Sequence, residues 1–440
     1  MTNSLPYDKG RSCVEVKPVV LFATPVLHHP PIGGPTLRIE NSIKALSQIS
    51  ELYLYSRVSL GSLGGTAALS FYQQYSKSFY FTPSAIPSNK HAEFAKRAVN
   101  FLARKAIKRN IFRSGAESPE IDFKHLLTVA DAIRADAIWL GYGNISYPLL
   151  KYIKSHSSYK VVVDTDSVWS RFVLRGLPFA KSAEERQKIE REGREKEEEE
   201  RWGTRLADVT TAVSQVDAEY YRSLVQDPGK IHLFSNVVDV DTYQQLLPPP
   251  HGSKKPCIYL AGTFWHNSPM ENAVRWVIQN VLPLVRQRIP SVHFYIIGTG
   301  SDQVLSDIQD PGITITGRLP SVLPYLCHAD VALVPLRWES GTRFKILEAG
   351  ACGIPVVSTT LGAEGIPVIP GSDILIADQP EAFADSIITL ITDSDLGRRI
   401  GESLKKLVQE RYSIASLVKE GQFILDYINS QDHLKPRTAQ

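Results

Sequence analysis

A strand-loop-helix pattern that recurs in both halves of the sequence constrains this fold most strongly. Residues 19–23 form a short apolar run that stops at a loop rich in Pro and Gly, after which apolar residues recur at helical spacing. Similar runs follow at residues 51–55, 137–140, 161–163, 257–260, 294–297, 313–315, 331–334 and 355–358. Such alternation is typical of α/β proteins with parallel sheets. We therefore expect an α/β fold built from Rossmann-like domains.

The pattern breaks once, at residues 246–256, where proline, glycine and charge replace the periodic apolar residues. A chain of 440 residues is long enough for two or three domains. We predict an N-terminal domain over residues 1–250 and a C-terminal domain over residues 257–440, whose last helix could cross back to the first domain. Because open parallel sheets bind ligands at the carboxyl ends of their strands, we expect the site in a cleft between the two domains.

Composition excludes several classes of protein. The 49 Lys and Arg nearly balance the 46 Asp and Glu, so the formal charge of +3 does not indicate a nucleic-acid partner. The four cysteines lie far apart in the sequence, which favours neither a zinc site nor a disulfide framework. The N-terminus lacks the apolar stretch of a signal peptide, and we expect a cytoplasmic protein without a spanning helix.

Two segments are strongly charged. Residues 184–201 mix acids and bases and predict a solvated helix, to which we assign no chemistry. Residues 89–113 combine eight bases and one acid with apolar residues at helical spacing. The latter pattern fits a surface helix packed on the first domain. It also fits a peripheral helix on the inner face of an anionic membrane.

Residues 335–357 carry the clearest chemical signal. A buried strand ends near Pro335, a short loop follows, and a helix then presents Lys345 and Glu348 three residues apart. We expect Thr342 to be the N-cap of this helix, so that free backbone N–H groups and Arg343 form an anion site. A diphosphate attached to a ribose would meet both the cations and the carboxylate. A surface ion pair on a helix is the alternative.

This segment resembles the nucleotide-binding signature of retaining glycosyltransferases of the GT-B fold. The resemblance is to family 4-like enzymes, in a subgroup that makes bacterial exopolysaccharides and cell-surface glycans. Glu348-Ala349 and the run Gly-Ile-Pro-Val-Val at residues 353–357 match the family pattern. The first glutamate of that pattern falls at Ser340 here, with Glu339 one residue further out. The loop Gly-Ala-Glu-Gly at residues 362–365 also occurs in the subgroup.

The resemblance implies roles for individual residues. Arg343, Lys345 and Glu339 would be catalytic and would replace a metal ion, so no cofactor or metal is expected. The donor would be bound by Glu348, Ser340, Gly341, Thr342, Gly262, Thr263, Gly298, Gly317, Arg318 and Leu319. The acceptor and phosphate loops would be Gly33, Gly34, Arg38, Gly141, Tyr142 and Asn144.

The implied reaction moves a sugar from a nucleotide diphosphate-sugar to a glycan, a lipid-linked acceptor or a small molecule, with retention of configuration. The N-domain histidine of many relatives has no counterpart, because the corresponding loop reads Gly-Tyr-Gly-Asn at residues 141–144. That departure keeps open a non-catalytic nucleotide- or glycan-binding protein, and also a nucleotide-sugar epimerase or a glycan phosphorylase. Asp164 and Asp166 spell the Asp-x-Asp of metal-dependent sugar transferases of another fold, but we assign them no metal.

Overall fold

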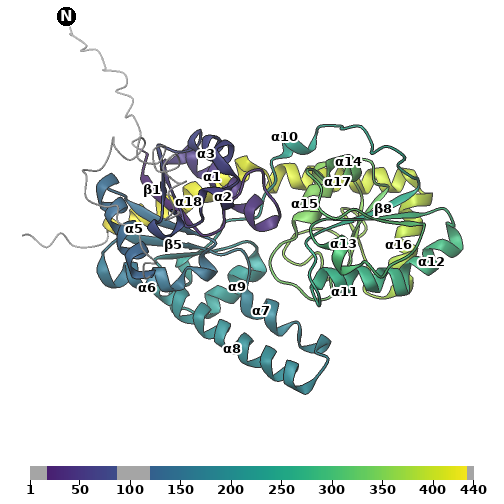
Figure 1. Cartoon of the computed structure of the whole chain (residues 1–440), viewed down its shortest axis with the longest axis horizontal. Coiled ribbons are helices and arrows are strands. Elements are labelled where there is room, and N and C mark those ends of the chain that lie inside the picture. Colours follow the sequence, from purple (N-terminus) through teal and green to yellow (C-terminus); the bar gives the residue numbers. More distant parts are fainter. Residues whose placement is uncertain (1–16, 87–118, 434–440) are drawn as a thin grey trace, which may run out of the picture.

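The computed structural model describes residues 17–86 and 119–433, which form two α/β domains (Figure 1). The N-terminal sheet has the strand order β3-β2-β1-β4-β5-β6-β7, and the C-terminal sheet has the order β10-β9-β8-β11-β12-β13. All strand pairs within both sheets are parallel. The predicted fold class is therefore confirmed. The basic segment at residues 89–113 lies outside the described residues.

The N-terminal domain alternates strands with helices. Its strands are β1 (Val19–Thr24), β2 (Glu51–Ser56), β3 (Ser78–Phe81), β4 (Ala137–Gly141), β5 (Lys160–Asp164), β6 (Val209–Ala212) and β7 (Ile231–Leu233). Its helices are α1 (Gly34–Ile49), α2 (Leu60–Leu63), α3 (Gly65–Gln73), α5 (Pro119–Ile133), α6 (Tyr147–His156), α7 (Trp169–Leu174), α8 (Ala183–Leu206) and α9 (Gln215–Ser223), and α10 (Val240–Tyr243) lies in the connection to the second domain. The central strands β1 and β4 are apolar and buried on both faces, as strands between two helical layers must be.

The C-terminal domain repeats this plan. Its strands are β8 (Cys257–Ala261), β9 (His293–Ile297), β10 (Ile313–Ile315), β11 (Val331–Val334), β12 (Val356–Ser358) and β13 (Leu375–Ile376). Its helices are α11 (Pro269–Trp276), α12 (Leu282–Arg288), α13 (Ser301–Val304), α14 (Leu323–Leu326), α15 (Phe344–Ala351), α16 (Pro380–Thr392) and α17 (Ser394–Arg411). Each of the nine apolar runs in the sequence corresponds to one of the strands of the two domains.

The apolar runs in the sequence do not predict four of the strands, namely β3, β6, β7 and β13. Strand β6 reads Val-Thr-Thr-Ala, and both of its threonines are buried. Thr211 is satisfied by hydrogen bonds within the domain. The Thr211 hydroxyl donates to the Asp164 carboxylate at 2.8 Å, and the Thr211 carbonyl accepts from Thr165 Oγ1 at 2.6 Å. Polar residues can therefore occupy a central strand when partners on the neighbouring strand satisfy them.

Two connections join the domains. Residues 234–256 lead from β7 to β8, and helix α18 (Ile414–His433) returns from α17 to pack on α1 of the N-terminal domain. Leu417, Ile424, Leu425 and Ile428 of α18 lie in the same buried cluster as Ile39 and Ile43 of α1. The two crossings meet where the Val238 N–H donates to the Tyr412 carbonyl at 3.0 Å.

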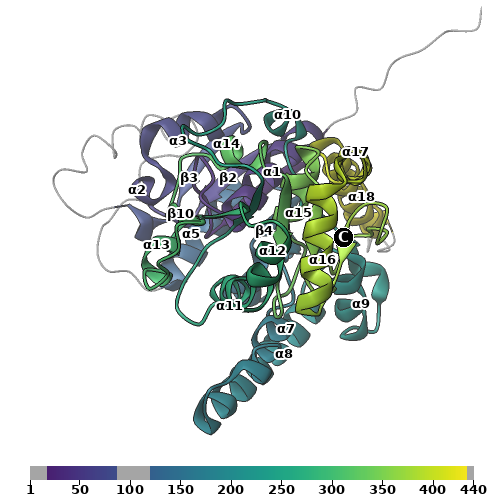
Figure 2. The same cartoon turned by 90° about the vertical axis from the view of Figure 1, so that its right-hand side faces the viewer.

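Helices α7 and α8 form a hairpin that projects from the N-terminal domain and runs below the C-terminal domain (Figure 1). Figure 2 shows the same hairpin extending well beyond both sheets. Helix α8 contains the mixed-charge segment that the sequence predicts to be solvated. Glu200 is an exception, because its carboxylate is buried and accepts hydrogen bonds from the backbone N–H groups of Trp169 and Ser170 at 2.7 and 3.1 Å. No helix of the described residues is both long enough and apolar enough to cross a membrane.

Candidate donor and acceptor site

The signature segment folds as a loop followed by helix α15, at the carboxyl end of β11. The helix begins at Phe344 with Arg343 as its N-cap, so the expected N-cap at Thr342 is wrong by one residue. Thr342 instead bonds to the N-terminal domain, since its hydroxyl accepts a hydrogen bond from Asn236 Nδ2 at 2.9 Å. Its side chain is therefore engaged across the domain interface and does not cap the helix.

Lys345 and Glu348 lie on α15 and are both partly buried. Burial lowers the pKa of Lys345, and nearby Arg343 lowers it further, whereas Glu339 and Glu348 raise it. Within the described part of the chain the Lys345 ammonium has no hydrogen bond or ion pair. A partly buried cation without a fixed partner is costly unless an anion compensates it. This position therefore suits a bound negative group.

Glu348 is held from the interdomain connection. The hydroxyl of Tyr243 on α10 donates to Glu348 Oε1 at 2.8 Å. Burial raises the pKa of the Glu348 carboxyl, and the Tyr243 hydrogen bond and Lys345 oppose this. The contact with Tyr243 fixes one carboxylate oxygen and leaves the other to accept hydrogen bonds from a ligand.

Arg343 and Ser340 stabilise the loop that precedes α15. Arg343 donates to the backbone carbonyls of Ser340, at 2.7 Å, and of Gly341, and reaches the Leu361 carbonyl at 3.4 Å. Burial lowers the pKa of its guanidinium. The Nε atom of Arg343 and the hydroxyl of Ser340 are buried and have no partner among the described residues. Arg343 thus binds backbone oxygens, whereas the sequence suggested that it points at a diphosphate.

Three glycine loops of the C-terminal domain converge beside α15. The Gly298 N–H donates to the Gly317 carbonyl at 3.0 Å, and the Gly262 N–H donates to the Ile297 carbonyl at 2.9 Å. A side chain on Gly298, which has φ +129°, would stand 1.9 Å from the Gly262 carbonyl oxygen. Only glycine permits this approach. The structure thus brings Gly262, Gly298 and Gly317 together, while Arg318 is exposed and Leu319 packs on the domain core.

The N-terminal glycine loop faces this assembly. A Cβ on Gly34 would lie 3.2 Å from the ring of Phe344, and one on Gly33 would lie 3.7 Å from Thr263 Oγ1. Gly341, with φ +77°, is equally close to the loop after β5, because its Cβ would lie 2.8 Å from the Asp166 carbonyl oxygen. The carboxyl ends of the two sheets therefore meet at these loops.

Arg38 is part of a buried polar chain that crosses this interface. Its guanidinium pairs with the Asp164 carboxylate, and it donates to Asn236 Oδ1 at 2.8 Å and the Phe234 carbonyl at 3.0 Å. Asn236 in turn donates to Thr342. Arg38 is only 2% exposed and Asp164 is fully buried. The structure therefore places Arg38, which the sequence suggested for the acceptor and phosphate loop, inside the domain rather than at its surface.

The loop after β4 contains the remaining predicted residues. Gly141 and Gly143 pack against buried side chains, and Tyr142 has φ +59°. Asn144 is buried and ties this loop to the next, because its Nδ2 donates to the Ser167 carbonyl at 2.9 Å and its Oδ1 accepts from the Asp166 N–H at 3.2 Å. Asn144 therefore supports the loop, while Tyr142 remains partly exposed at the interface.

Asp166 is a candidate that the sequence analysis set aside. Asp166 is a partly exposed residue just beyond the end of β5, and its carboxylate accepts a hydrogen bond from Trp169 Nε1 at 3.0 Å. Burial raises the pKa of Asp166 to about 6, against the effects of Trp169 and Arg38. No group of three or more His, Cys, Asp or Glu side chains in residues 17–86 and 119–433 could hold a metal ion. The triplet pattern identified the residue, but only the fold places it opposite Gly341.

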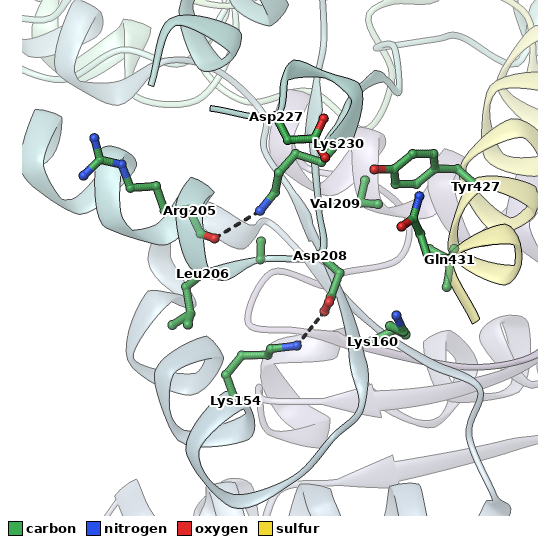
Figure 3. Close-up of a pocket in the computed structure, with 12 residues that line it drawn as sticks. Lys154, Lys160, Arg205, Leu206, Asp208, Val209, Asp227, Lys230, Tyr427 and Gln431 are labelled. Carbon is green, nitrogen blue, oxygen red and sulfur yellow. Dashed lines mark hydrogen bonds and ion pairs between the residues drawn. The ribbon is translucent and has the colours of Figure 1, made fainter. Parts of the chain in front are cut away.

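A cavity of about 290 Å³ lies elsewhere, at the amino ends of β5 and β6 (Figure 3). Its polar groups bond to one another. Lys154 pairs with Asp208 at 2.8 Å, and Lys230 Nζ donates to the Arg205 carbonyl at 3.0 Å. It lies at the sheet edge opposite the glycine loops, so we assign it no part in the candidate site.

Comparison with known families finds a match within the C-terminal domain. Residues 255–393 match the family model described as glycosyl transferases group 1. The matched stretch is about a third of the chain. It includes α15 with Lys345 and Glu348, and the loops of Gly262, Gly298 and Gly317.

Two curated proteins share sequence with the chain. It is 26% identical over 237 residues to N-acetyl-alpha-D-glucosaminyl L-malate synthase of Bacillus anthracis, a match covering 50% of this chain and 60% of that protein. It is 24% identical over 225 residues to the phosphatidylinositol N-acetylglucosaminyltransferase gpi3 subunit of Schizosaccharomyces pombe, covering 48% and 46%. The chain thus matches no more than about 60% of the length of these relatives.

Solved structures confirm the GT-B arrangement of the two domains. HepE of Anabaena, solved in complex with UDP-glucose, superposes with a TM-score of 0.62 at 12% identity, over 94% of this chain and 99% of that chain. Sucrose-phosphate synthase of Thermosynechococcus elongatus gives a TM-score of 0.63 at 15% identity, over 94% and 100%. The expected fold is therefore confirmed over the described chain as a whole.

Proposed function

We propose that this protein is a glycosyltransferase that moves a sugar from a nucleotide diphosphate-sugar to a hydroxyl acceptor, with retention of configuration and without a bound metal. The observation that carries the proposal is Lys345, a partly buried residue whose ammonium has no fixed partner in the described part of the chain, inside the segment that matches group 1 glycosyl transferases. The UDP and UDP-glucose complexes of HepE support a nucleotide-sugar as donor. We expect the acceptor to be a glycan, a lipid-linked sugar or a small molecule.

In this proposal the donor lies against α15. Lys345 neutralises the negative charge that develops on the diphosphate as the anomeric bond breaks, and Glu348 accepts hydrogen bonds from the ribose hydroxyls. Arg343 acts indirectly. Its guanidinium does not contact the donor but fixes the carbonyls of Ser340 and Gly341 in the loop beside it. The Ser340 hydroxyl is buried and has no partner within residues 17–86 and 119–433, and together with Glu339 it supplies polar contacts to the sugar.

Nucleotide binding should be detectable without a known acceptor. Thermal unfolding of the wild type with UDP, GDP, ADP or TDP in the presence of EDTA should give a selective stabilisation, about 2.7 kcal/mol at 100 times the dissociation constant. Glu348→Gln should lose that shift, because an amide replaces the carboxylate while its oxygen still accepts from Tyr243. Glu402→Gln, an exposed glutamate on α17, is the matched control. A shift that required a divalent metal would contradict the metal-free proposal.

On the acceptor side, we propose that Asp166 accepts a hydrogen bond from the attacking hydroxyl. It lies in the N-terminal domain, where it is partly exposed and adjoins the backbone of Gly341. Its environment includes Tyr142, Trp169 and Arg38, and Glu339 lies near Tyr142 on the other side of the interface. The Asp166 carboxylate would thus act on the acceptor side, where many relatives have a histidine that this sequence lacks in the loop at residues 141–144.

Asp166→Asn should lower transfer and raise stability at neutral pH. The folded pKa, about 6, exceeds the value of 3.8 for an unperturbed aspartate. The folded protein thus holds this proton more tightly, so the group stabilises the fold below pH 4, and that contribution disappears as the pH rises through 6. The stability difference between variant and wild type should grow by about 2 kcal/mol between pH 4 and pH 7.

Urea unfolding at several pH values measures this difference. Asp385→Asn, at an exposed position on α16, should show no such pH dependence. Full transfer activity in Asp166→Asn would show that Asp166 has no role in binding the acceptor, whatever the stability of the variant.

A further inference from the structure

The α7–α8 hairpin contacts the C-terminal domain beside the candidate donor site. It includes the charged residues 184–201, to which the sequence analysis assigned no chemistry. The two helices of the hairpin pack closely against each other. Gly193 of α8 lies so close to Leu174 of α7 that a Cβ would stand 2.3 Å from the leucine side chain. Glu200 fixes the start of α7 through the backbone N–H groups of Trp169 and Ser170. The segment between the two helices is therefore carried on a close-packed support.

One side chain of that segment joins two loops of the other domain. The Arg175 guanidinium makes a bidentate ion pair with Glu364, with nitrogen-oxygen distances of 2.7 and 2.9 Å. It also donates to the backbone carbonyl of Glu339 at 2.7 Å. Glu339 belongs to the loop before α15, and Glu364 belongs to the loop after β12. Only about a quarter of each side chain of this pair is exposed. The buried remainder partly shields the charge-assisted hydrogen bonds from water.

Neighbouring contacts follow the same path. The ring of Phe179 packs on Trp338 with centroids 4.4 Å apart, and the guanidinium of Arg337 lies 5.2 Å from the Phe179 ring. At the end of the segment, Lys181 Nζ donates to Asn267 Oδ1 at 2.6 Å. The hairpin therefore meets the loops after β8, β11 and β12, and each of these loops follows a strand at the carboxyl edge of the sheet.

The two loops that Arg175 contacts both lie next to residues of the candidate donor site. The Glu339 carbonyl immediately precedes Ser340 and Gly341, whose own carbonyls accept hydrogen bonds from Arg343. Gly365 lies against the N-terminal domain as well, since its Cβ would stand 2.8 Å from Ser214 Cβ and 3.1 Å from Thr342 Cγ2. Arg175 thus fixes one end of a short loop whose other end carries the donor-binding residues.

We propose that Arg175 is a positioning residue that holds the loops of Glu339 and Glu364 in the geometry that binds the donor. The α7–α8 hairpin is accordingly a clamp between the domains. This inference rests on the proposed function, because the loops matter for binding only if the donor lies at α15. Arg175 itself does not touch the reacting atoms.

A charge-reversal cycle tests the assignment. Arg175→Glu places two carboxylates together, so the donor KM should rise at least tenfold with a smaller change in kcat. The double variant Arg175→Glu with Glu364→Arg restores the opposite charges and should recover at least threefold of that loss. Arg175→Lys keeps the positive charge but loses the two parallel hydrogen bonds of the guanidinium. Its donor KM should therefore lie between those of the wild type and Arg175→Glu. Arg186→Glu, an exposed arginine on α8 of the same hairpin, is the matched control and should leave the donor KM unchanged.

A second measurement does not depend on turnover. Small-angle X-ray scattering should give a larger radius of gyration for Arg175→Glu than for the wild type or Arg186→Glu, because the clamp opens. Circular dichroism and thermal unfolding establish that each variant is folded, and Arg175→Lys serves if Arg175→Glu is not.

The outcomes separate the two hypotheses. A donor KM within twofold of the wild type in Arg175→Glu, or no recovery in the double variant, would overturn the positioning role. If the wild type binds no nucleotide-sugar, the proposed function fails. In that case scattering still decides the clamp, because an unchanged radius of gyration in Arg175→Glu overturns it.

Discussion

Replacing Lys345 with methionine should lower the rate of sugar transfer by a factor on the order of 10²–10³, the usual cost of removing one preorganised group that stabilises developing charge. The loss should fall mainly on kcat, since negative charge on the departing diphosphate is greatest in the transition state. Methionine keeps much of the length of the lysine side chain and removes its charge. Steady-state kinetics with the nucleotide-sugar selected by the thermal panel would measure the effect.

The same variant should be at least as stable as the wild type. Burial lowers the pKa of Lys345, so the unfolded chain holds the proton more tightly than the folded protein does. At neutral pH, carrying the charge therefore costs folding free energy, and that cost disappears as the pH rises above the unfolded value. A variant that loses activity without losing stability identifies a residue kept for function rather than for the fold.

Lys406→Met is a suitable control, because Lys406 lies on α17 with 76% of its side chain exposed. Neither its activity nor its melting temperature should change appreciably. Transfer by Lys345→Met within threefold of the wild type would show that another group neutralises the diphosphate, and would leave the proposed donor geometry without its central contact.

The sequence predicted most of the strands because their buried runs are continuous and apolar, a property that does not depend on partners far along the chain. It did not predict β6 or β7. Thr211 of β6 becomes acceptable in the core through bonds to Asp164, at the end of β5, and to Thr165, just after it. Strand β7 reads Ile-His-Leu, so a histidine interrupts its short apolar run. Such elements are defined by tertiary contacts, which local patterns do not contain.

The candidate site was predictable to different degrees in its two halves. Lys345 and Glu348 were accessible because one helix carries both, so their spacing fixes their geometry. Arg343 was assigned to the diphosphate on the same spacing, but its guanidinium turns back to the loop carbonyls. Helical spacing gives the direction of a side chain only once the first residue of the helix is known, and Arg343 is the N-cap.

Contacts between the domains could not be predicted from the sequence. Arg175 and Glu364 lie 189 residues apart, and no local sequence pattern indicates which acid an arginine will meet at such a separation. Asp166 had a motif, but the triplet suggested a metal ligand. Its position opposite Gly341 depends on how β5 of one domain faces the loop after β11 of the other.

Replacing Arg38 with methionine should be among the most destabilising single substitutions in the chain. It removes the partner of the fully buried Asp164 carboxylate, and breaking a buried ion pair in this way typically costs about 3–5 kcal/mol. The Thr211 hydroxyl would still donate to Asp164, but one neutral hydrogen bond does not compensate a buried negative charge. Urea unfolding followed by circular dichroism would measure the change.

The double variant Arg38→Met with Asp164→Leu separates the two roles of Arg38. Because it removes both charges, it should recover much of the lost stability, as apolar replacements of buried pairs often do. It should not recover nucleotide binding in full, since Asn236 loses the Arg38 donor that orients its amide toward Thr342 at the start of the donor loop. Recovery of both properties would show that the buried chain serves only the stability of the N-terminal domain. Recovery of stability alone would show that this chain also transmits the position of α1 to the donor loop.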